Sequence, residues 1–252
     1  MRKLGFLVAI PIVGALMGVA PAVAQPAPNV TAFCDAALNA DKASYKVFGA
    51  ARPKQKDLQA LVAAFTQVQG GAPAELTASV QEAADAARNA AQAGKDPSQD
   101  AAFLRNLNAI NEYRYNSCGY QTVDVTATEY EFVGLPKTVK PGPVAIKLTD
   151  TGAELHELAS FRLKTKDSVK KVLGLSNKEQ NSKIERTGGT IVLQGDTTYV
   201  VVDMSKPGRY GVACFLPVGS TSAQEAEAKS HQHGGTPHWK KGMYGTITSR
   251  NA

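Results

Sequence analysis

The chain has 252 residues, of which 43% are hydrophobic and 20% charged, and its formal net charge is +6. This length suits one large domain or two small ones. The Lys and Arg residues are spread along the chain and form no basic stripe, which argues against nucleic acid as a partner. Three cysteines are too few for a disulfide framework, and the odd number leaves at least one thiol that needs its own explanation.

Residues 1–24 have the features of a cleavable secretion signal. Arg2 and Lys3 form a short positive end, an apolar stretch follows from Leu4 to Val19, and Ala22-Val23-Ala24 is a small-x-small cleavage pattern. Glycine and proline interrupt the apolar stretch, which is too short for a spanning helix of roughly 20 apolar residues. We therefore expect cleavage after Ala24 and a mature chain without a membrane span, either secreted or in the periplasm or cell envelope.

A linker at residues 25–32 is expected to lead into a helical domain at residues 33–119. This domain is rich in Ala, Leu, Gln, Asn, Lys and Glu, and apolar residues recur at helical spacing within it, as at Leu58, Leu61, Val62 and Phe65. Glycine and proline divide it into four predicted helices, at about 34–47, 54–68, 74–93 and 99–117. The simplest packing is an up-down-up-down four-helix bundle.

The helix count makes a prediction about two of the cysteines. In a bundle of four antiparallel helices, the start of the first helix and the end of the fourth lie at the same end. Cys34 and Cys118 occupy these positions, so we expect a disulfide between them in an oxidising compartment. Two buried free thiols are the alternative. If the bridge forms, Cys214 is left as the unpaired thiol.

Residues 120–252 change to short β-rich runs that glycine and proline separate. Alternation at period two predicts a first strand at 123–132, and the first of the strands below, 144–148, follows a Pro-Gly-Pro turn. The other predicted strands are 144–148, 157–163, 190–193, 197–202, 209–214 and 244–248, with one helical excursion at 168–173. About seven short strands predict a Greek-key β-sandwich or barrel, so the chain is expected to be an α+β multidomain protein.

All four histidines, the unpaired cysteine and a late methionine fall inside this β domain. They are His156, His231, His233, His238, Cys214 and Met243. Two imidazoles, one thiolate and a weak thioether form the ligand set of a blue-copper electron-transfer centre, because the soft donors accommodate both copper oxidation states. His156 begins a middle strand, Cys214 ends the penultimate one and Met243 begins the last, so we expect these strand ends to converge at one pole of a sandwich.

Residues 123–249 resemble the cupredoxins, the type 1 blue-copper family that includes plastocyanin and azurin. The resemblance rests on three motifs, Leu155-His156-Glu157-Leu158, Pro207-Gly208-Arg209-Tyr210-Gly211-Val212-Ala213-Cys214 and Pro237-His238-Trp239-Lys240-Lys241-Gly242-Met243-Tyr244-Gly245-Thr246-Ile247-Thr248. Four residues separate His238 from Met243, as in plastocyanin-like copper loops. The resemblance implies one type 1 copper ion, with His156, Cys214 and His238 as equatorial ligands and Met243 as the axial ligand.

Two features depart from the family pattern. Twenty-three residues separate Cys214 from His238, whereas plastocyanin-type loops have only a few, so His231 or His233 is an alternative second imidazole. His156 is followed by Glu157, where blue-copper proteins commonly have an asparagine whose side chain ties the ligand loops together.

These features predict an exported copper-binding protein for electron transfer or copper handling, with a redox or cell-envelope protein as its partner. The alternative is a metal-free cupredoxin-like module for binding or cell-envelope interaction. A multicopper oxidase is not expected because its repeated His-x-His pairs are missing. A Cys/His nucleophile is not expected either, because no third group that would orient it can be named. We therefore expect an electron-transfer or binding protein and not an enzyme.

Overall fold

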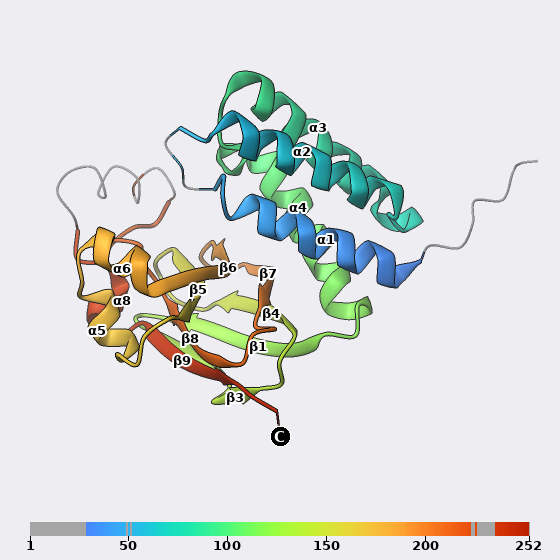
Figure 1. Ribbon diagram of the computed structural model, residues 1–252. Helices are drawn as coiled ribbons and strands as arrows, with labels where there is room; N and C mark the ends of the chain where they lie inside the picture. Colours follow the sequence, from blue (N-terminus) through green and yellow to red (C-terminus); the bar gives the residue numbers. More distant parts are fainter. Residues whose placement is uncertain (1–28, 49, 51, 223–224, 226–234, 252) are drawn as a thin grey trace, which may run out of the picture.

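The computed structural model describes residues 29–48, 50, 52–222, 225 and 235–251, and its helical part precedes its β part (Figure 1). The α+β fold class is therefore confirmed. The predicted signal sequence at residues 1–24 lies outside the described residues. None of the helices in the described ranges combines the length and the apolar character that a bilayer span needs.

Four α-helices form the N-terminal part, and each packs against the next along the chain. They are α1 (Val30–Ser44), α2 (Gln55–Gly70), α3 (Thr77–Ala93) and α4 (Ala101–Ser117), with the short turns η1 (Ala74–Leu76) and η2 (Pro97–Gln99) between them. Helix α1 begins earlier than predicted, because the Asn29 side chain accepts the N–H of Ala32 (3.1 Å) and caps it. Since α4 also packs against the β part, a closed four-helix bundle remains a prediction.

The predicted disulfide between Cys34 and Cys118 is present, with 5.9 Å between the two Cα atoms. It joins the first turns of α1 to the C-cap of α4. Arg114 and Asp41 form an ion pair (2.7 Å) between the same two helices, and the Arg114 side chain is only 1% exposed. A covalent bond and a buried ion pair therefore connect the first and last helices.

The β part consists of two sheets. One has the strand order β2-β1-β4-β7 and the other β3-β9-β8-β5-β6. The strands are β1 (Gln121–Thr128), β2 (Glu131–Val133), β3 (Thr138–Val139), β4 (Pro143–Asp150), β5 (His156–Leu163), β6 (Ile184–Val192), β7 (Thr197–Asp203), β8 (Gly208–Ala213) and β9 (Tyr244–Ser249). Strand pairs β1–β4 and β3–β9 are parallel, and the other pairs are antiparallel.

Apolar side chains from both sheets meet in one buried core, so the β part is a sandwich, as predicted. Val125 and Ile146 from the first sheet pack in the same cluster as Leu158, Val212 and Ile247 from the second. The alternation of these residues along their strands turns every second side chain inward.

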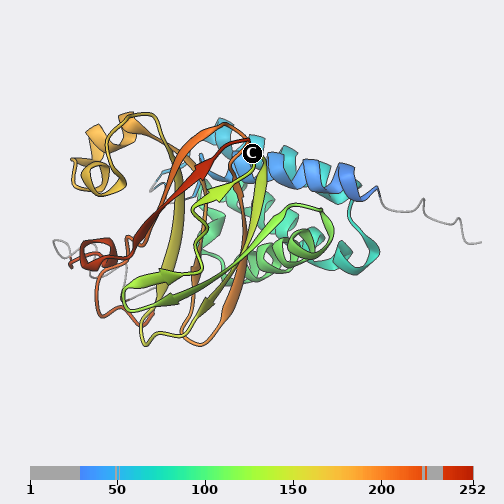
Figure 2. The same ribbon diagram turned by 90° about the horizontal axis from the view of Figure 1, so that it is seen from below.

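The predicted strand at 123–132 is wrong in its extent. The chain reverses after Thr128, which pairs with Glu131, so this stretch is the hairpin β1–β2. Three short helices lie beside the second sheet: α5 (Val169–Leu173), α6 (Asn177–Lys183) and α8 (His238–Lys241). Only α5 was predicted, since α6 has no apolar residue that could show a helical period and α8 spans only four residues. All three lie at the end of the sandwich away from the start of α1 (Figures 1 and 2).

Helix α4 covers the open edge of the first sheet. Strand β7 is the last strand of that sheet, so the N–H and C=O of Tyr199 on its outer side have no partner strand. Asn108 on α4 accepts the N–H of Tyr199 (2.7 Å), and Asn111 donates to its carbonyl (3.2 Å). Two side-chain amides thus take the place of a neighbouring strand and protect the edge from pairing with another chain.

Replacing Asn108 with alanine is expected to lower the free energy of unfolding by about 1 to 3 kcal/mol, because it leaves the Tyr199 N–H without an acceptor. Urea unfolding followed by circular dichroism measures the change. Asn106 provides the control, because it lies on the same helix and bonds only to Glu82 at the surface. Asn106→Ala should change the free energy by less than about 0.5 kcal/mol. Equal losses for the two variants would contradict a role for Asn108 at the sheet edge.

Candidate metal centre

Three adjacent strands bring predicted ligands to one end of the sandwich. His156 is the first residue of β5, Cys214 directly follows β8 and Met243 directly precedes β9. The order β9-β8-β5 makes these strands neighbours. The N–H of Cys214 donates to the carbonyl of Met243 (3.1 Å), which extends the β8–β9 pairing by one step. Strand register therefore places the three residues side by side.

His238 reaches the same end because the long insertion after Cys214 returns to its own start. The N–H of Val218 donates to the carbonyl of Thr236 (2.9 Å). The N–H of His238 donates to the carbonyl of Leu216 (2.9 Å). These bonds close the insertion at its base, so its length does not move His238 away from Cys214.

The side chains of His156, Cys214 and His238 meet in the protein interior. Nδ1 of His238 lies 3.2 Å from Nδ1 of His156 and 3.4 Å from Sγ of Cys214. One donor atom from each residue lies within 4.8 Å of the other two. All three residues are fully buried. The structure therefore brings together three of the four residues predicted as ligands.

The fourth predicted ligand, Met243, is also fully buried, and its N–H donates to the carbonyl of His238 (3.2 Å). These contacts fix its backbone beside the cluster, and the role of its sulfur as an axial ligand stays a prediction. The alternative ligands His231 and His233 lie outside the described residues.

The donor separations fit a single metal ion. Two donors that each bind an ion at about 2.0 to 2.3 Å, with angles between tetrahedral and trigonal, lie roughly 3.2 to 3.8 Å apart. The distances of 3.2 and 3.4 Å from Nδ1 of His238 fall in this range. Imidazole nitrogen and thiolate sulfur suit copper or zinc, whereas magnesium and calcium prefer oxygen. The residues present therefore fit copper.

Burial sets the protonation of the three donors. It lowers the pKa of His156, which the neighbouring His238 lowers further, and it lowers the pKa of His238 despite the opposing effect of Glu154. Both imidazoles are therefore neutral near pH 7, and each keeps a lone pair for a metal. Burial raises the pKa of the Cys214 thiol to about 12, so a metal must displace its proton in order to bind.

Glu157 connects the segment that carries His156 to the segment that carries Cys214. Its N–H donates to Sγ of Cys214 (3.3 Å), and this bond favours the thiolate form. Its carboxylate accepts the N–H of Phe215 (3.2 Å), the residue that follows the cysteine. Glu157 thus ties the ligand loops together, which is the task that the family pattern gives to an asparagine.

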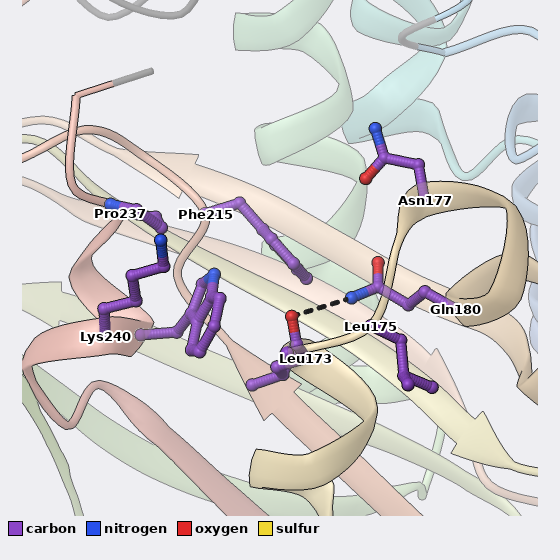
Figure 3. Close-up of a pocket in the computed structure, with 9 residues that line it drawn as sticks. Leu173, Leu175, Asn177, Gln180, Phe215, Pro237 and Lys240 are labelled. Carbon is purple, nitrogen blue, oxygen red and sulfur yellow. Dashed lines mark hydrogen bonds between the residues drawn. The ribbon is translucent and has the colours of Figure 1, made fainter. Parts of the chain in front are cut away.

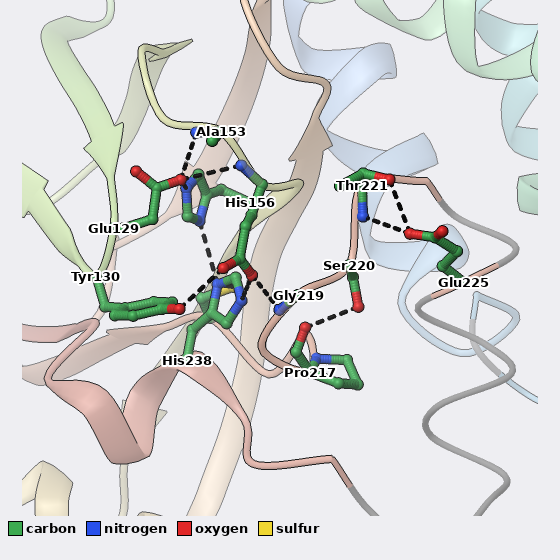
Figure 4. Close-up of polar contacts among 12 residues, drawn as sticks. Glu129, Tyr130, Ala153, His156, Pro217, Gly219, Ser220, Thr221, Glu225 and His238 are labelled. Atoms are coloured by element: carbon green, nitrogen blue, oxygen red, sulfur yellow. Dashed lines mark hydrogen bonds and ion pairs between the residues drawn. The ribbon is translucent and has the colours of Figure 1, made fainter.

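A carboxylate lies beside the outer nitrogen of each imidazole (Figure 4). Nε2 of His238 lies 3.1 Å from Oε2 of Glu154, and Nε2 of His156 lies 3.5 Å from Oε1 of Glu129. Tyr130 donates its hydroxyl to the other oxygen of Glu154 (2.8 Å), and its ring packs on the edge of His238. The bond to Glu154 turns the Nδ1 of His238 toward His156 and Cys214, as outer carboxylates do in metal sites, whereas Nε2 of His156 makes no hydrogen bond among the described residues.

These outer residues were not predicted from the sequence. Glu129 and Tyr130 come from the turn between β1 and β2, far from the ligand motifs along the chain. Glu154 lies in the bend before β5, two residues before His156, and no periodic pattern marks it in the sequence.

Replacing Glu154 with alanine is expected to weaken copper binding by about 10- to 100-fold, because the His238 ring loses the group that orients it. Competition with a chelator of known affinity measures this loss. Glu131→Ala is the control, since Glu131 is an exposed carboxylate on the neighbouring β2. An unchanged affinity in the Glu154 variant would contradict a positioning role for this residue.

Comparisons with known proteins give distant likenesses only. No protein-family profile matches the chain, and no curated protein sequence matches it. Among solved structures, a reduced auracyanin from Roseiflexus castenholzii is 16% identical over 52% of this chain and 98% of its own, with a TM-score of 0.34. Auracyanin A, a blue copper protein from Chloroflexus aurantiacus, is 14% identical over 52% of this chain and 100% of its own (TM-score 0.35).

The multicopper oxidase McoA from Aquifex aeolicus is a third such likeness, 18% identical over 54% of this chain and 30% of its own, with a TM-score of 0.31. Likenesses at these TM-scores are too distant to carry an argument. The function of this chain has to be inferred from its own residues and their geometry.

Proposed function

We propose that this chain is an exported, cupredoxin-like protein that binds one copper ion for electron transfer or copper handling. His156, Cys214 and His238 hold the ion, and Met243 is the axial ligand. The observation that carries the proposal is the meeting of two imidazoles and one thiol, all fully buried, with their donor atoms within 4.8 Å of one another. When bound, copper supplies a couple that gains or loses one electron.

The surrounding chain supports electron transfer because it restrains the ligands before any metal arrives. Backbone hydrogen bonds join Cys214 to Met243 and His238 to Leu216. The Glu154 carboxylate orients the His238 imidazole from outside, and Glu129 lies 3.5 Å from the outer nitrogen of His156. A ligand set that hardly moves between two oxidation states favours rapid gain and loss of an electron. The nucleophile reading has no support, since the buried thiol is protonated and has no opening to a substrate.

Two features of the chain support a location outside the cytoplasm. The disulfide between Cys34 and Cys118 belongs to an oxidising environment. The predicted signal at residues 1–24 supplies a route to it. We therefore place the protein outside the cytoplasm, in the periplasm, the cell envelope or the medium.

A metal-free binding module is the second candidate, and one observation favours it. His238 Nδ1 lies within hydrogen-bonding distance of both His156 Nδ1 and Cys214 Sγ, so these atoms have polar neighbours without a metal, and Nε2 of His156 alone in this cluster has no hydrogen-bond partner among the described residues. A buried polar cluster of this kind is stable when its members are paired.

Titration of the purified mature chain with Cu(II) separates the two candidates. The copper protein is expected to take up one equivalent and to develop an intense visible absorption band from the thiolate–copper bond, whereas the module would develop none. Zn(II) is the matched control, because it suits the same ligands but has no redox chemistry and gives no colour. Absence of both the band and tight binding would leave the metal-free module as the function.

A further inference from the structure

A shallow pocket lies between the short helices and the two ligand loops (Figure 3). Its volume is about 280 Å³. The residues that matter for its chemistry are Leu173, Leu175, Gln180, Phe215, Trp239 and Lys240. Gln180 on α6 donates to the carbonyl of Leu173 at the end of α5 (3.5 Å), which holds one wall of the pocket together. The pocket therefore has a defined wall and a mixed lining, in which apolar side chains such as Phe215 and Trp239 lie beside polar ones such as Gln180 and Lys240.

The net positive charge of the chain lies in two segments that contribute residues to this pocket. Residues 164–183 and 238–241 contain eight lysines and two acidic residues, and the remainder of the chain contains 20 basic and 20 acidic residues. Seven of these lysines are exposed on α5, α6, α8 and the residues before α5, namely Lys164, Lys166, Lys170, Lys171, Lys178, Lys240 and Lys241. These lysines come from two separate segments of the sequence. The fold brings α5, α6 and α8, the helices of these segments, to one end of the molecule (Figure 1).

The two acidic residues in these segments do little to offset this charge. Asp167 pairs with Lys171 and Lys183 (2.7 Å each). Glu179 is engaged in the cap of α6, where it accepts from Ser176. The face around the pocket therefore presents a local excess of positive charge to an approaching molecule.

The proposed ligands reach the surface only through their chain neighbours. His238 is fully buried, with Glu154 at its outer nitrogen and Tyr130 at its ring edge, and Cys214 is fully buried too. Phe215 follows Cys214 in the chain, and Trp239 follows His238; both are partly exposed and line the pocket. The pocket is thus separated from the metal centre by a single residue on each of two ligand segments.

We infer that this basic face is the docking surface for an acidic one-electron carrier protein, which inserts an apolar side chain against Phe215 and Trp239. This inference rests on the proposed function. As Cu(II) is reduced to Cu(I), the carrier is oxidised by one electron, and no atom is transferred. The pocket volume lies below the roughly 300 Å³ at which pockets for drug-sized ligands begin, so it suits a side chain better than a free ligand.

Electron exchange with a carrier of reversible charge tests the inference. The probes are cytochrome c, which is basic, and the same protein with succinylated lysines, which is acidic. Stopped-flow measurement at low salt, in the direction that the midpoint potentials favour, gives the second-order rate constant with the copper-loaded chain. The variant Lys170→Glu/Lys178→Glu/Lys240→Glu should lose at least about tenfold in rate with the acidic form and gain with the basic form.

The control variant is Lys46→Glu/Lys56→Glu/Lys95→Glu, which makes the same change in net charge at exposed positions of the helical part. Its rates should stay close to those of the unmodified chain, and both variants should keep the copper band. A normal band with equal rates for the two variants would overturn this inference alone. An absent band in the unmodified chain would overturn the proposed function and the inference together. The unmodified chain could also bind vesicles of anionic lipid. If the variant Lys170→Glu/Lys178→Glu/Lys240→Glu lost this binding but kept its electron-transfer rates, the face would be assigned to a membrane and the inference would be overturned.

Discussion

Replacing Cys214 with serine is expected to abolish the intense visible band of the copper-loaded protein and most of its copper affinity. The band arises from the bond between thiolate sulfur and Cu(II). A serine hydroxyl cannot replace this sulfur, because it is not a soft, anionic donor. The Cys214 sulfur is fully buried and lies 3.4 Å from Nδ1 of His238. The other two cysteines are joined in a disulfide, so no other thiol can take its place at the cluster. Absorption spectra during a Cu(II) titration measure both effects.

Met243→Leu is the control for this prediction, because it also changes one buried sulfur residue at the same end of the sandwich. It removes only the weak axial contact, so copper and the visible band should persist while the reduction potential shifts. A Cys214→Ser protein that kept the band would rule out the thiolate as a ligand. Equal loss of copper in the two variants would point to a general collapse of the core instead.

Removing the disulfide is expected to cost about 4 to 5 kcal/mol of unfolding free energy, the largest stability effect that we predict. The bridge spans 84 residues, and closing a loop of that length restricts the unfolded chain by about this amount. The variant Cys34→Ala/Cys118→Ala removes it, and because Cys34 is almost fully buried, the loss of its sulfur adds the cost of a small cavity. Urea unfolding of the variant and of the unmodified protein measures the difference.

The unmodified protein treated with a reducing agent is the control for this experiment, and its stability should fall to that of the double variant. The copper band of the double variant should survive at low urea, because the metal centre is built from β5, β8 and β9. A loss below about 1 kcal/mol would contradict a stabilising role for the bridge.

Much of the fold followed from local patterns. The helical period of Leu58, Leu61 and Phe65 predicted α2, and all three residues are buried in the helical core. The pairing of Cys34 with Cys118 followed from an even number of antiparallel helices. The positions of His156, Cys214 and Met243 at strand ends predicted that they would converge, since neighbouring strands of a sandwich end at a shared pole.

The remaining features depend on contacts between distant segments, which no local pattern records. The insertion after Cys214 left His231 or His233 as an alternative second imidazole, and the backbone bonds of Leu216 and Val218 explain why His238 still lies beside Cys214. Glu129 reaches His156 across 27 positions of the chain. In the sequence, Asn108 and Asn111 look like any other polar residues on a helix. Their role is recognised only from their bonds to Tyr199 at the edge of the sheet.

X-ray absorption at the copper K edge of the fully loaded chain tests the central proposal most directly, because it reports the kind and distance of the atoms bound to the metal. The proposal predicts one sulfur at about 2.2 to 2.3 Å and two imidazole nitrogens at about 2.0 Å, from Cys214, His156 and His238. The spectrum should be the same in the variant His231→Ala/His233→Ala. A copper ion surrounded only by nitrogen and oxygen, or a signal that disappears in that variant, would contradict the site.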